Sequence, residues 1–161
     1  MSNRIEAKVT HHYRASPERV FDAFLDPALA RRWQAAWLHR TGRTGRLSRS
    51  EIDPRVGGDF VFAEAREGDE MRHRGRFLAL ERPTKVAFSW FADAPEENDA
   101  DEIAMIIEPE PNGPGSIVTL YDSMGALEQE RLAQAEKTWL DLLWAIEDVI
   151  ERRDIPMTLN A

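Results

Sequence analysis

The feature that most constrains the fold is an apolar stripe in the C-terminal part of the chain. Between Glu128 and Arg152, apolar residues recur every three to four positions, and this spacing places them on one face of an α-helix. At about 1.5 Å per residue, such a helix would span roughly 37 Å, enough to cross a whole β-sheet. Gly125 marks the break before the helix, and Pro156 lies beyond its end. The stripe consists of Leu132, Ala135, Trp139, Leu142, Leu143, Ile146, Val149 and Ile150.

The segments ahead of this helix are typical of short helices and strands. Residues 5–13 partly alternate in polarity and predict a first strand. Ser16-Pro17 and Asp26-Pro27 each combine a capping side chain with a proline at the first helical position, so they predict two short helices. Six further strands are predicted over residues 50–53, 59–65, 71–81, 85–91, 102–108 and 115–123. Consecutive strands joined by short turns favour an antiparallel sheet, which the long helix would cover.

Four segments carry a resemblance to a known family. They are residues 15–27 closed by Trp33, residues 54–62, residues 75–90 and the terminal helix with Trp139. In this order they resemble the helix-grip fold of the START/SRPBCC superfamily, and more narrowly its AHSA branch of heat-shock-protein ATPase-activator-like domains. The resemblance implies an α+β fold, in which a curved antiparallel sheet of about six to seven strands, in the order β-α-α-β6-α, wraps around the C-terminal helix. We therefore expect one START-like, AHSA-type domain over residues 1–161.

Two segments lack apolar anchors and predict mobile loops. The first, residues 37–48, is rich in Gly and Arg, and the second, residues 93–101, is acidic. In and beside the first segment Arg40, Arg43, Arg46 and Arg49 recur every three residues. They could recognise an acidic partner or ligand, but a solvated loop is the favoured interpretation.

Composition excludes several classes of function. The chain has no cysteine, so it can form neither a disulfide nor a thiolate site. Its net charge of -8 argues against nucleic acid as a partner. No apolar run is long enough to span a bilayer, and residues 1–6 lack the apolar core of a signal peptide. We therefore expect a cytoplasmic protein without a membrane partner.

Strand alternation predicts an aromatic pocket. Along residues 71–81, three arginines share one face, whereas His73 and Phe77 share the other. Three cations would not be buried without partners, so the His73 face must point inward. We expect a cavity of roughly 300–1,000 Å³ between the sheet and the terminal helix, opening near residues 37–49. Its predicted ligand-binding residues are Trp33, Trp37, Phe62, His73, Phe77, Trp90, Met105, Tyr121, Trp139 and Leu143.

Signals for catalysis are weak. The four histidines, His11, His12, His39 and His73, do not have the spacing of a metal site, and no phosphate loop or nucleophile motif is present. We expect no metal, no cofactor and no catalytic residue; for an enzyme, only His73 and Tyr121 could be nominated as polar groups in the pocket. The acidic side chains Glu64, Glu102, Glu108 and Asp122 are expected to face solvent and to balance the three arginines.

Three functions remain open at this point. The first is binding of a hydrophobic or aromatic small molecule in the predicted cavity. The second is an enzyme similar to polyketide cyclases, and the third is a protein-interaction module similar to cochaperones. The eukaryotic relatives that stimulate a chaperone carry an additional N-terminal domain, which we do not expect in this protein, so a chaperone partner is not expected either. A homodimer remains open.

Overall fold

The computed structural model describes residues 4–41, 46–66, 68–92 and 100–151. In these residues two helices follow the first strand, and a long helix follows the last. The strands are β1 (Arg4–Tyr13), β2 (Arg46–Ile52), β3 (Asp59–Arg66), β4 (Asp69–Glu81), β5 (Lys85–Ala92), β6 (Asp101–Pro109) and β7 (Ser116–Gly125). The helices are α1 (Pro17–Leu25), α2 (Pro27–Arg40), the short 3-10 helix η2 (Ala126–Arg131) and α3 (Leu132–Ile150).

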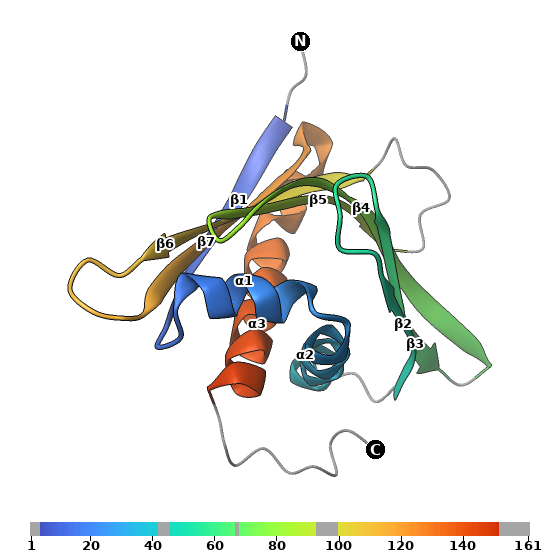
Figure 1. Ribbon diagram of the computed structural model, residues 1–161. Coiled ribbons are helices and arrows are strands. Elements are labelled where there is room, and N and C mark those ends of the chain that lie inside the picture. The colour runs from blue at the N-terminus through green and yellow to red at the C-terminus, as the bar shows by residue number, and fades with distance from the viewer. Residues whose placement is uncertain (1–3, 42–45, 67, 93–99, 152–161) are drawn as a thin grey trace.

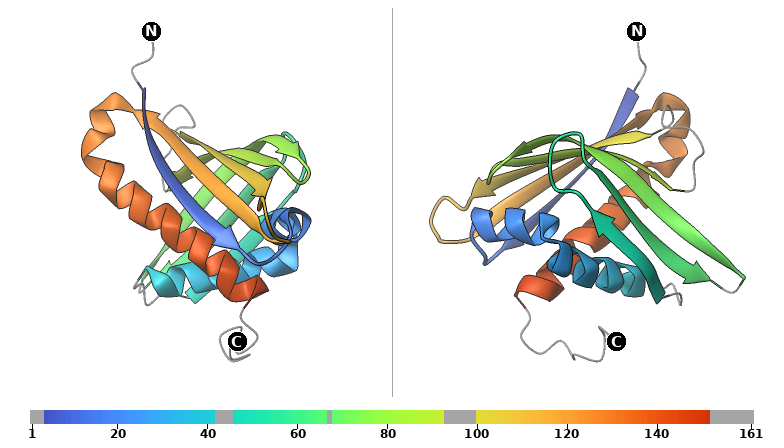
Figure 2. Two further views of the ribbon diagram at one scale, coloured as in Figure 1. Left: turned by 90° about the vertical axis from the view of Figure 1, so that its left-hand side faces the viewer. Right: turned by 45° about the vertical axis from the view of Figure 1, so that its right-hand side comes forward.

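The strands form one antiparallel sheet in the order β1-β7-β6-β5-β4-β3-β2. The sheet curves, and α1, α2 and α3 all lie on the same side of it (Figure 1). Figure 2 shows α3 running obliquely across the inner face of the sheet. This arrangement confirms the helix-grip α+β fold that the sequence predicts.

The predicted capping residues begin both short helices. The hydroxyl of Ser16 accepts a hydrogen bond from the backbone N–H of Arg19, at 3.3 Å. One carboxylate oxygen of Asp26 accepts from the N–H groups of Ala28 and Leu29, at 2.9 and 3.1 Å. A proline follows each cap, where its missing N–H costs no helical hydrogen bond.

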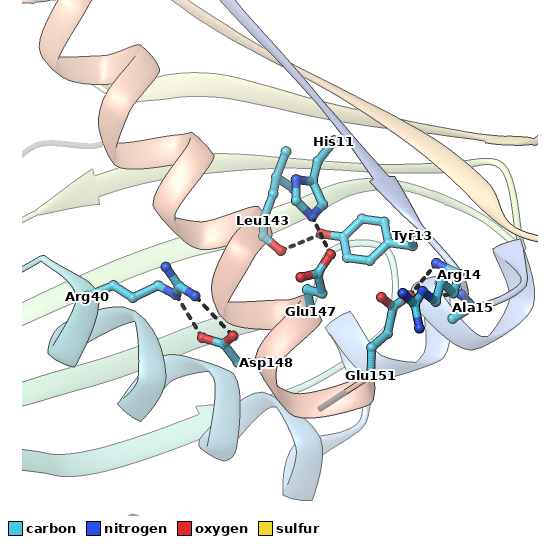
Figure 3. A network of polar contacts seen from close by, with 9 residues as sticks. All are labelled: His11, Tyr13, Arg14, Ala15, Arg40, Leu143, Glu147, Asp148 and Glu151. Atoms are coloured by element: carbon cyan, nitrogen blue, oxygen red, sulfur yellow. Dashed lines mark hydrogen bonds and ion pairs between the residues drawn. The ribbon is translucent and has the colours of Figure 1, made fainter. Parts of the chain in front are cut away.

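A polar network fixes α3 against β1 and α2 (Figure 3). The hydroxyl of Tyr13 donates to the backbone oxygen of Leu143 at 2.6 Å, and His11 Nε2 lies 3.0 Å from a carboxylate oxygen of Glu147. Burial raises the pKa of Tyr13 well above its ordinary value, so the hydroxyl keeps the proton that it donates. At the end of α3 the carboxylate of Glu151 accepts from the backbone N–H groups of residues 14 and 15. A bidentate pair between Arg40 and Asp148, at 2.7 and 3.0 Å, joins α2 to α3.

The boundaries differ from the prediction around residues 37–52. Helix α2 continues to Arg40, and β2 begins at Arg46, so the loop predicted over residues 37–48 is wrong at both ends. The helix extends because Trp37 and Leu38 are buried and add an apolar face. Residues 42–45 and 93–99, which make up most of what remains of the two predicted loops, lie outside the described residues. None of the described helices combines the length and the apolar character that crossing a bilayer requires.

Gly75 allows two parts of the inner face to approach closely. A Cβ atom at Gly75 would lie 1.9 Å from the backbone oxygen of Ser89 and 2.4 Å from Cζ of Phe60. Both distances are far shorter than van der Waals contact. The missing side chain therefore lets the Phe60 ring approach β4 at Gly75, where it joins the aromatic cluster described below.

Candidate functional site

The inner face of the sheet is lined with aromatic rings. Alternation in β3, β4 and β5 turns one set of side chains toward the helices. Helices α1, α2 and α3 add rings from the opposite side. Neighbouring ring centroids lie 4.6 to 6.5 Å apart, within the range of favourable aromatic packing. The cluster consists of Phe24, Trp33, Trp37, Phe60, Phe62, His73, Phe77, Phe88, Trp90 and Trp139.

The rings enclose a cavity of only about 20 Å³. The predicted volume of roughly 300–1,000 Å³ is therefore wrong, because the large rings fill most of the space that they line. Two lining residues, Ile52 on β2 and Trp90 on β5, are half-buried, and the others are buried. The lining residues are Phe24, Trp33, Gln34, Trp37, Ile52, Phe60, Phe77, Phe88, Trp90, Trp139 and Leu142.

The buried tryptophans of this cavity differ in how their indole N–H groups are used. The N–H of Trp37 donates to the backbone oxygen of Thr138 at 3.1 Å. The N–H of Trp139 donates to Oδ2 of Asp122 at 2.7 Å. The indole nitrogen of Trp33 is also buried, but it has no hydrogen-bond partner among the described residues. One donor on the cavity wall is thus unsatisfied, which is rare in protein interiors.

A pair of carboxyl groups lies behind Trp139. Asp101 on β6 and Asp122 on β7 both turn inward and are buried, and their side chains lie within hydrogen-bonding reach of each other. Burial raises the pKa of Asp122 to about 7, and the hydrogen bond to Asp101 and its charge add to the rise. The Trp139 N–H and the charge of Arg131 act in the opposite direction. Arg131 Nη2 lies 3.4 Å from Oδ1 of Asp101, and the Arg131 side chain is about half exposed.

The burial of Asp122 and Glu64 corrects the prediction that the acidic side chains face solvent. Glu102 and Glu108 are exposed as expected, but Glu64 and Asp122 are each only 1% exposed. Asp122 alternates in step with the buried Leu120 and Met124, and this parity turns it inward despite its charge. The raised pKa of Asp122 favours its protonated form, and protonation reduces the cost of burying two carboxyl groups together.

The remaining polar groups on the inner face lie near α2. His73 is buried and stacks on Phe62, with ring centroids 4.6 Å apart. Gln34 lines the cavity, and its amide oxygen accepts a hydrogen bond from the hydroxyl of Ser50 at 2.6 Å. In the described part of the chain, no group of three or more His, Asp or Glu side chains is placed to hold a metal ion.

The structure brings most of the predicted site residues together. Trp33, Trp37, Phe77, Trp90 and Trp139 line the cavity. Phe62 and His73 pack against the Trp37 ring, whereas Met105 and Leu143 are buried in the core without lining the cavity.

The predicted orientation of Tyr121 is wrong. Its neighbours Leu120 and Asp122 point inward, and Lys8, an exposed residue of β1, lies 5.8 Å from the centroid of the Tyr121 ring. Tyr121 therefore belongs to the outer face of the sheet, because successive side chains of a strand alternate. The polar pair of His73 and Tyr121 does not form.

Several cavity residues were not predicted. Phe60 and Phe88 share strand parity with Phe62 and Trp90, so alternation alone would have found them. Phe24 and Leu142 lie on the apolar faces of α1 and α3. Gln34 has no sequence signal, because a glutamine within a helix is ordinarily exposed.

A larger groove of about 570 Å³ lies on the outer face of β2 to β5. Its walls carry Arg49, Arg72 and Arg74 together with Glu51, Asp53 and Asp59. Ion pairs tie several of these charges to neighbours, for example Asp59 to Arg76 at 3.0 Å. The arginines of β4 face outward, as predicted. The lining therefore holds equal numbers of acidic and basic residues, and its formal charges balance.

Comparison with known proteins gives a family and a fold. The family model described as Activator of Hsp90 ATPase homolog 1-like protein matches residues 14–151. No curated protein matches the chain. A solved structure from Rhodobacter sphaeroides is 17% identical, with a TM-score of 0.72 over 96% of this chain and 95% of its own.

Two further solved structures are similar. CalU16 from Micromonospora echinospora is 19% identical, with a TM-score of 0.61 over 99% of this chain and 90% of its own. DynU16, described as a protein in the dynemicin biosynthetic locus, is 18% identical, with a TM-score of 0.67 over 91% of this chain and 47% of its own. At these identities the likeness shows a shared fold alone.

Proposed function

The chain belongs to the family of Activator of Hsp90 ATPase homolog 1-like proteins, and we propose that it binds an apolar or aromatic small molecule between the sheet and α3. The observation that carries this proposal is the convergence of aromatic rings from six elements on one small cavity. Ligand pockets are typically lined in this way, by apolar and aromatic side chains with a few polar groups that fix orientation. Gln34 and the indole of Trp33 are polar groups of this kind.

Binding requires the cavity to expand. A volume of about 20 Å³ holds at most about one water molecule, so a ligand must displace at least one ring. Trp90 is the ring best placed to move, because it is half-buried whereas the other lining rings are buried. Its centroid lies 5.1 Å from Trp139 and 5.6 Å from Trp37, so its displacement would open space beside both indoles.

The interaction-module hypothesis has less support. Large apolar side chains are exposed at Val56, Leu78 and Trp144 in the described residues. They lie on the turn after β2, on β4 and on α3, and Trp144 packs against His11 with centroids 4.5 Å apart. A docking surface for a partner normally requires a contiguous apolar patch of several hundred Å².

A second candidate function is acid–base catalysis. The Asp101–Asp122 pair favours it, because a carboxyl with its pKa near neutrality can donate or accept a proton at working pH. The fold shared with DynU16 is compatible with a biosynthetic role. Neither aspartate lines the cavity, however, so the pair would contact a substrate only after Trp139 moves. An Asp122→Asn variant that binds substrate but no longer converts it would favour this function over simple binding.

The binding proposal is tested by native mass spectrometry of protein purified from its host, together with titration of a panel of monocyclic and bicyclic aromatic molecules. We expect a retained or titrated ligand in wild type. Leu142→Phe should fill the cavity and abolish binding at a stability cost of about 1–3 kcal/mol. Leu78→Phe, on the exposed side of β4, is the matched control and should bind normally. Absence of binding in wild type, or unchanged affinity in Leu142→Phe, contradicts the proposal.

A further inference from the structure

Trp33, a residue of the cavity wall, carries a buried indole N–H that has no hydrogen-bond partner among the described residues. Of the three buried tryptophans that line the cavity, Trp37 donates its indole N–H to Thr138, and Trp139 donates to Asp122. The indole nitrogen of Trp33 is as deeply buried, in a residue only 4% exposed, and has no partner among the described residues. An unsatisfied buried N–H is costly, because folding strips it of water without replacing the hydrogen bond.

The packing around Trp33 restricts where an acceptor can reach this N–H. Phe24 stacks on the indole, with centroids 5.2 Å apart and an interplanar angle of 10°. Phe62 approaches with an interplanar angle of 77°, at 6.3 Å. An indole N–H lies in the plane of its ring, so Phe24, which covers a face of the indole, does not occupy the direction in which this N–H points. Trp33 itself is part of the cavity wall.

A second polar group lies next to Trp33 on α2. Gln34 also lines the cavity, and its hydrogen bond with Ser50 uses the amide oxygen. The amide nitrogen of Gln34 carries two further donors. None of the described residues that line the cavity is a carboxylate, and the polar groups of the lining include the indole of Trp33 and the amide of Gln34.

On the basis of the binding function above, we propose that Trp33 Nε1–H selects ligands that carry a hydrogen-bond-accepting oxygen, with an aromatic ketone or a similar carbonyl compound as the chemical class. The apolar ring of such a ligand enters the aromatic cluster, and its carbonyl oxygen accepts from Trp33. A hydrocarbon of the same shape fills the same space but leaves the indole N–H unsatisfied. The protein therefore prefers the carbonyl compound, because binding of the hydrocarbon leaves the buried indole N–H of Trp33 without an acceptor.

The test uses two probes of nearly equal shape, acetophenone and α-methylstyrene, in which the carbonyl oxygen is replaced by a CH₂ group. Affinities are measured by ligand-observed NMR for wild type, Trp33→Phe and Trp37→Phe. We expect wild type to bind acetophenone about tenfold more tightly than α-methylstyrene. Trp33→Phe should bring the two affinities close together. Trp37→Phe removes an indole N–H that is already bonded to Thr138, so it should retain the preference.

A measurement on the unmodified protein covers the case in which Trp33→Phe does not fold. The indole ¹H–¹⁵N resonance of Trp33 should move downfield with acetophenone and not with α-methylstyrene. Equal affinity of wild type for both probes would overturn the selectivity while leaving the binding function intact. Failure of both probes, and of the wider aromatic panel, to bind would overturn the binding function and the selectivity with it.

Discussion

At the scale of single residues, the chain depends on one position where no side chain fits. Gly75 lies where a Cβ atom would approach the backbone oxygen of Ser89 to 1.9 Å. A backbone oxygen held in a sheet cannot move aside as the end of a flexible side chain can. The position therefore requires glycine for reasons of space.

We predict that Gly75→Ala lowers the free energy of unfolding by about 3 kcal/mol or more, because the new methyl group must displace β5 or the Phe60 ring. Urea denaturation measures this loss. Gly125→Ala is the matched control, because its Cβ would have nothing within 4 Å and its φ is -65°. That variant should stay within about 0.5 kcal/mol of wild type. A small effect at Gly75 would show that the sheet adjusts here.

Asp122 makes stability depend on pH. Its pKa of about 7 in the folded state lies above its ordinary value of 3.8, so the folded protein binds this proton more tightly than the unfolded chain does. The contribution to stability is complete below about pH 4 and is lost as the pH rises through about 7. The charges that face Asp122 are those of Asp101 on β6 and Arg131 on η2.

We predict that Asp122→Asn removes this dependence, because an amide can still accept from Trp139 and donate to Asp101 without titrating. Relative to wild type, the variant should gain stability between pH 5 and pH 8 in urea denaturation. Glu102→Gln, an exposed carboxylate on β6, serves as the control and should follow the wild-type profile. Parallel profiles of Asp122→Asn and wild type would show that Asp122 stays ionised in the folded protein.

At the scale of elements, α3 is held by a large ring on its apolar face. Trp139 packs against Trp37 and Trp90 and donates to Asp122, so one side chain connects α3 to α2, β5 and β7. Trp144 lies one and a half turns further along the same helix and is 39% exposed. The same substitution can therefore be compared at a buried and at a partly exposed tryptophan of one helix.

We predict that Trp139→Ala costs about 3–5 kcal/mol, which is the range for truncating a large aromatic side chain in a core. Trp144→Ala should cost clearly less, because part of its ring already contacts water. Both values come from urea melts monitored by circular dichroism. A loss below about 1 kcal/mol for Trp139→Ala would mean that α3 does not depend on this contact.

At the scale of the whole molecule, the order of elements could be predicted from local signals. The capping pairs before α1 and α2, the alternation along β4 and the stripe of α3 each depend on neighbours in the sequence. The size of the cavity could not be predicted, because parity tells which rings point inward but not how closely they pack. Tyr121 and Asp122 were assigned to the wrong faces, since an aromatic residue was expected inside and a charged one outside. The structure shows the opposite: Asp122 points inward because it is two residues from the buried Leu120, and Tyr121, which lies between them, points outward.

A ligand in the cavity would contact residues of three helices and four strands, because the lining residues come from α1, α2, α3 and β2 to β5. Its binding should therefore stabilise these elements together. If acetophenone binds there, it should raise the free energy of global unfolding by about 2.7 kcal/mol at one hundred times its dissociation constant. Hydrogen exchange should slow in α2, β5 and α3 together. Leu142→Phe should show neither effect. Stabilisation of the same size in that variant would place the ligand elsewhere.

The indoles of Trp37, Trp90 and Trp139 form a triangle, with centroid separations of 5.6, 5.7 and 5.1 Å and interplanar angles of 50°, 31° and 75°. The electronic transitions of chromophores this close couple, and a tilted, non-planar arrangement of the rings can make the coupled transitions optically active. We therefore expect these rings to add an exciton couplet to the circular dichroism spectrum of the helices and sheet. Because each ring belongs to a different element, the couplet records whether α2, β5 and α3 are packed together, even where the backbone signal is unchanged.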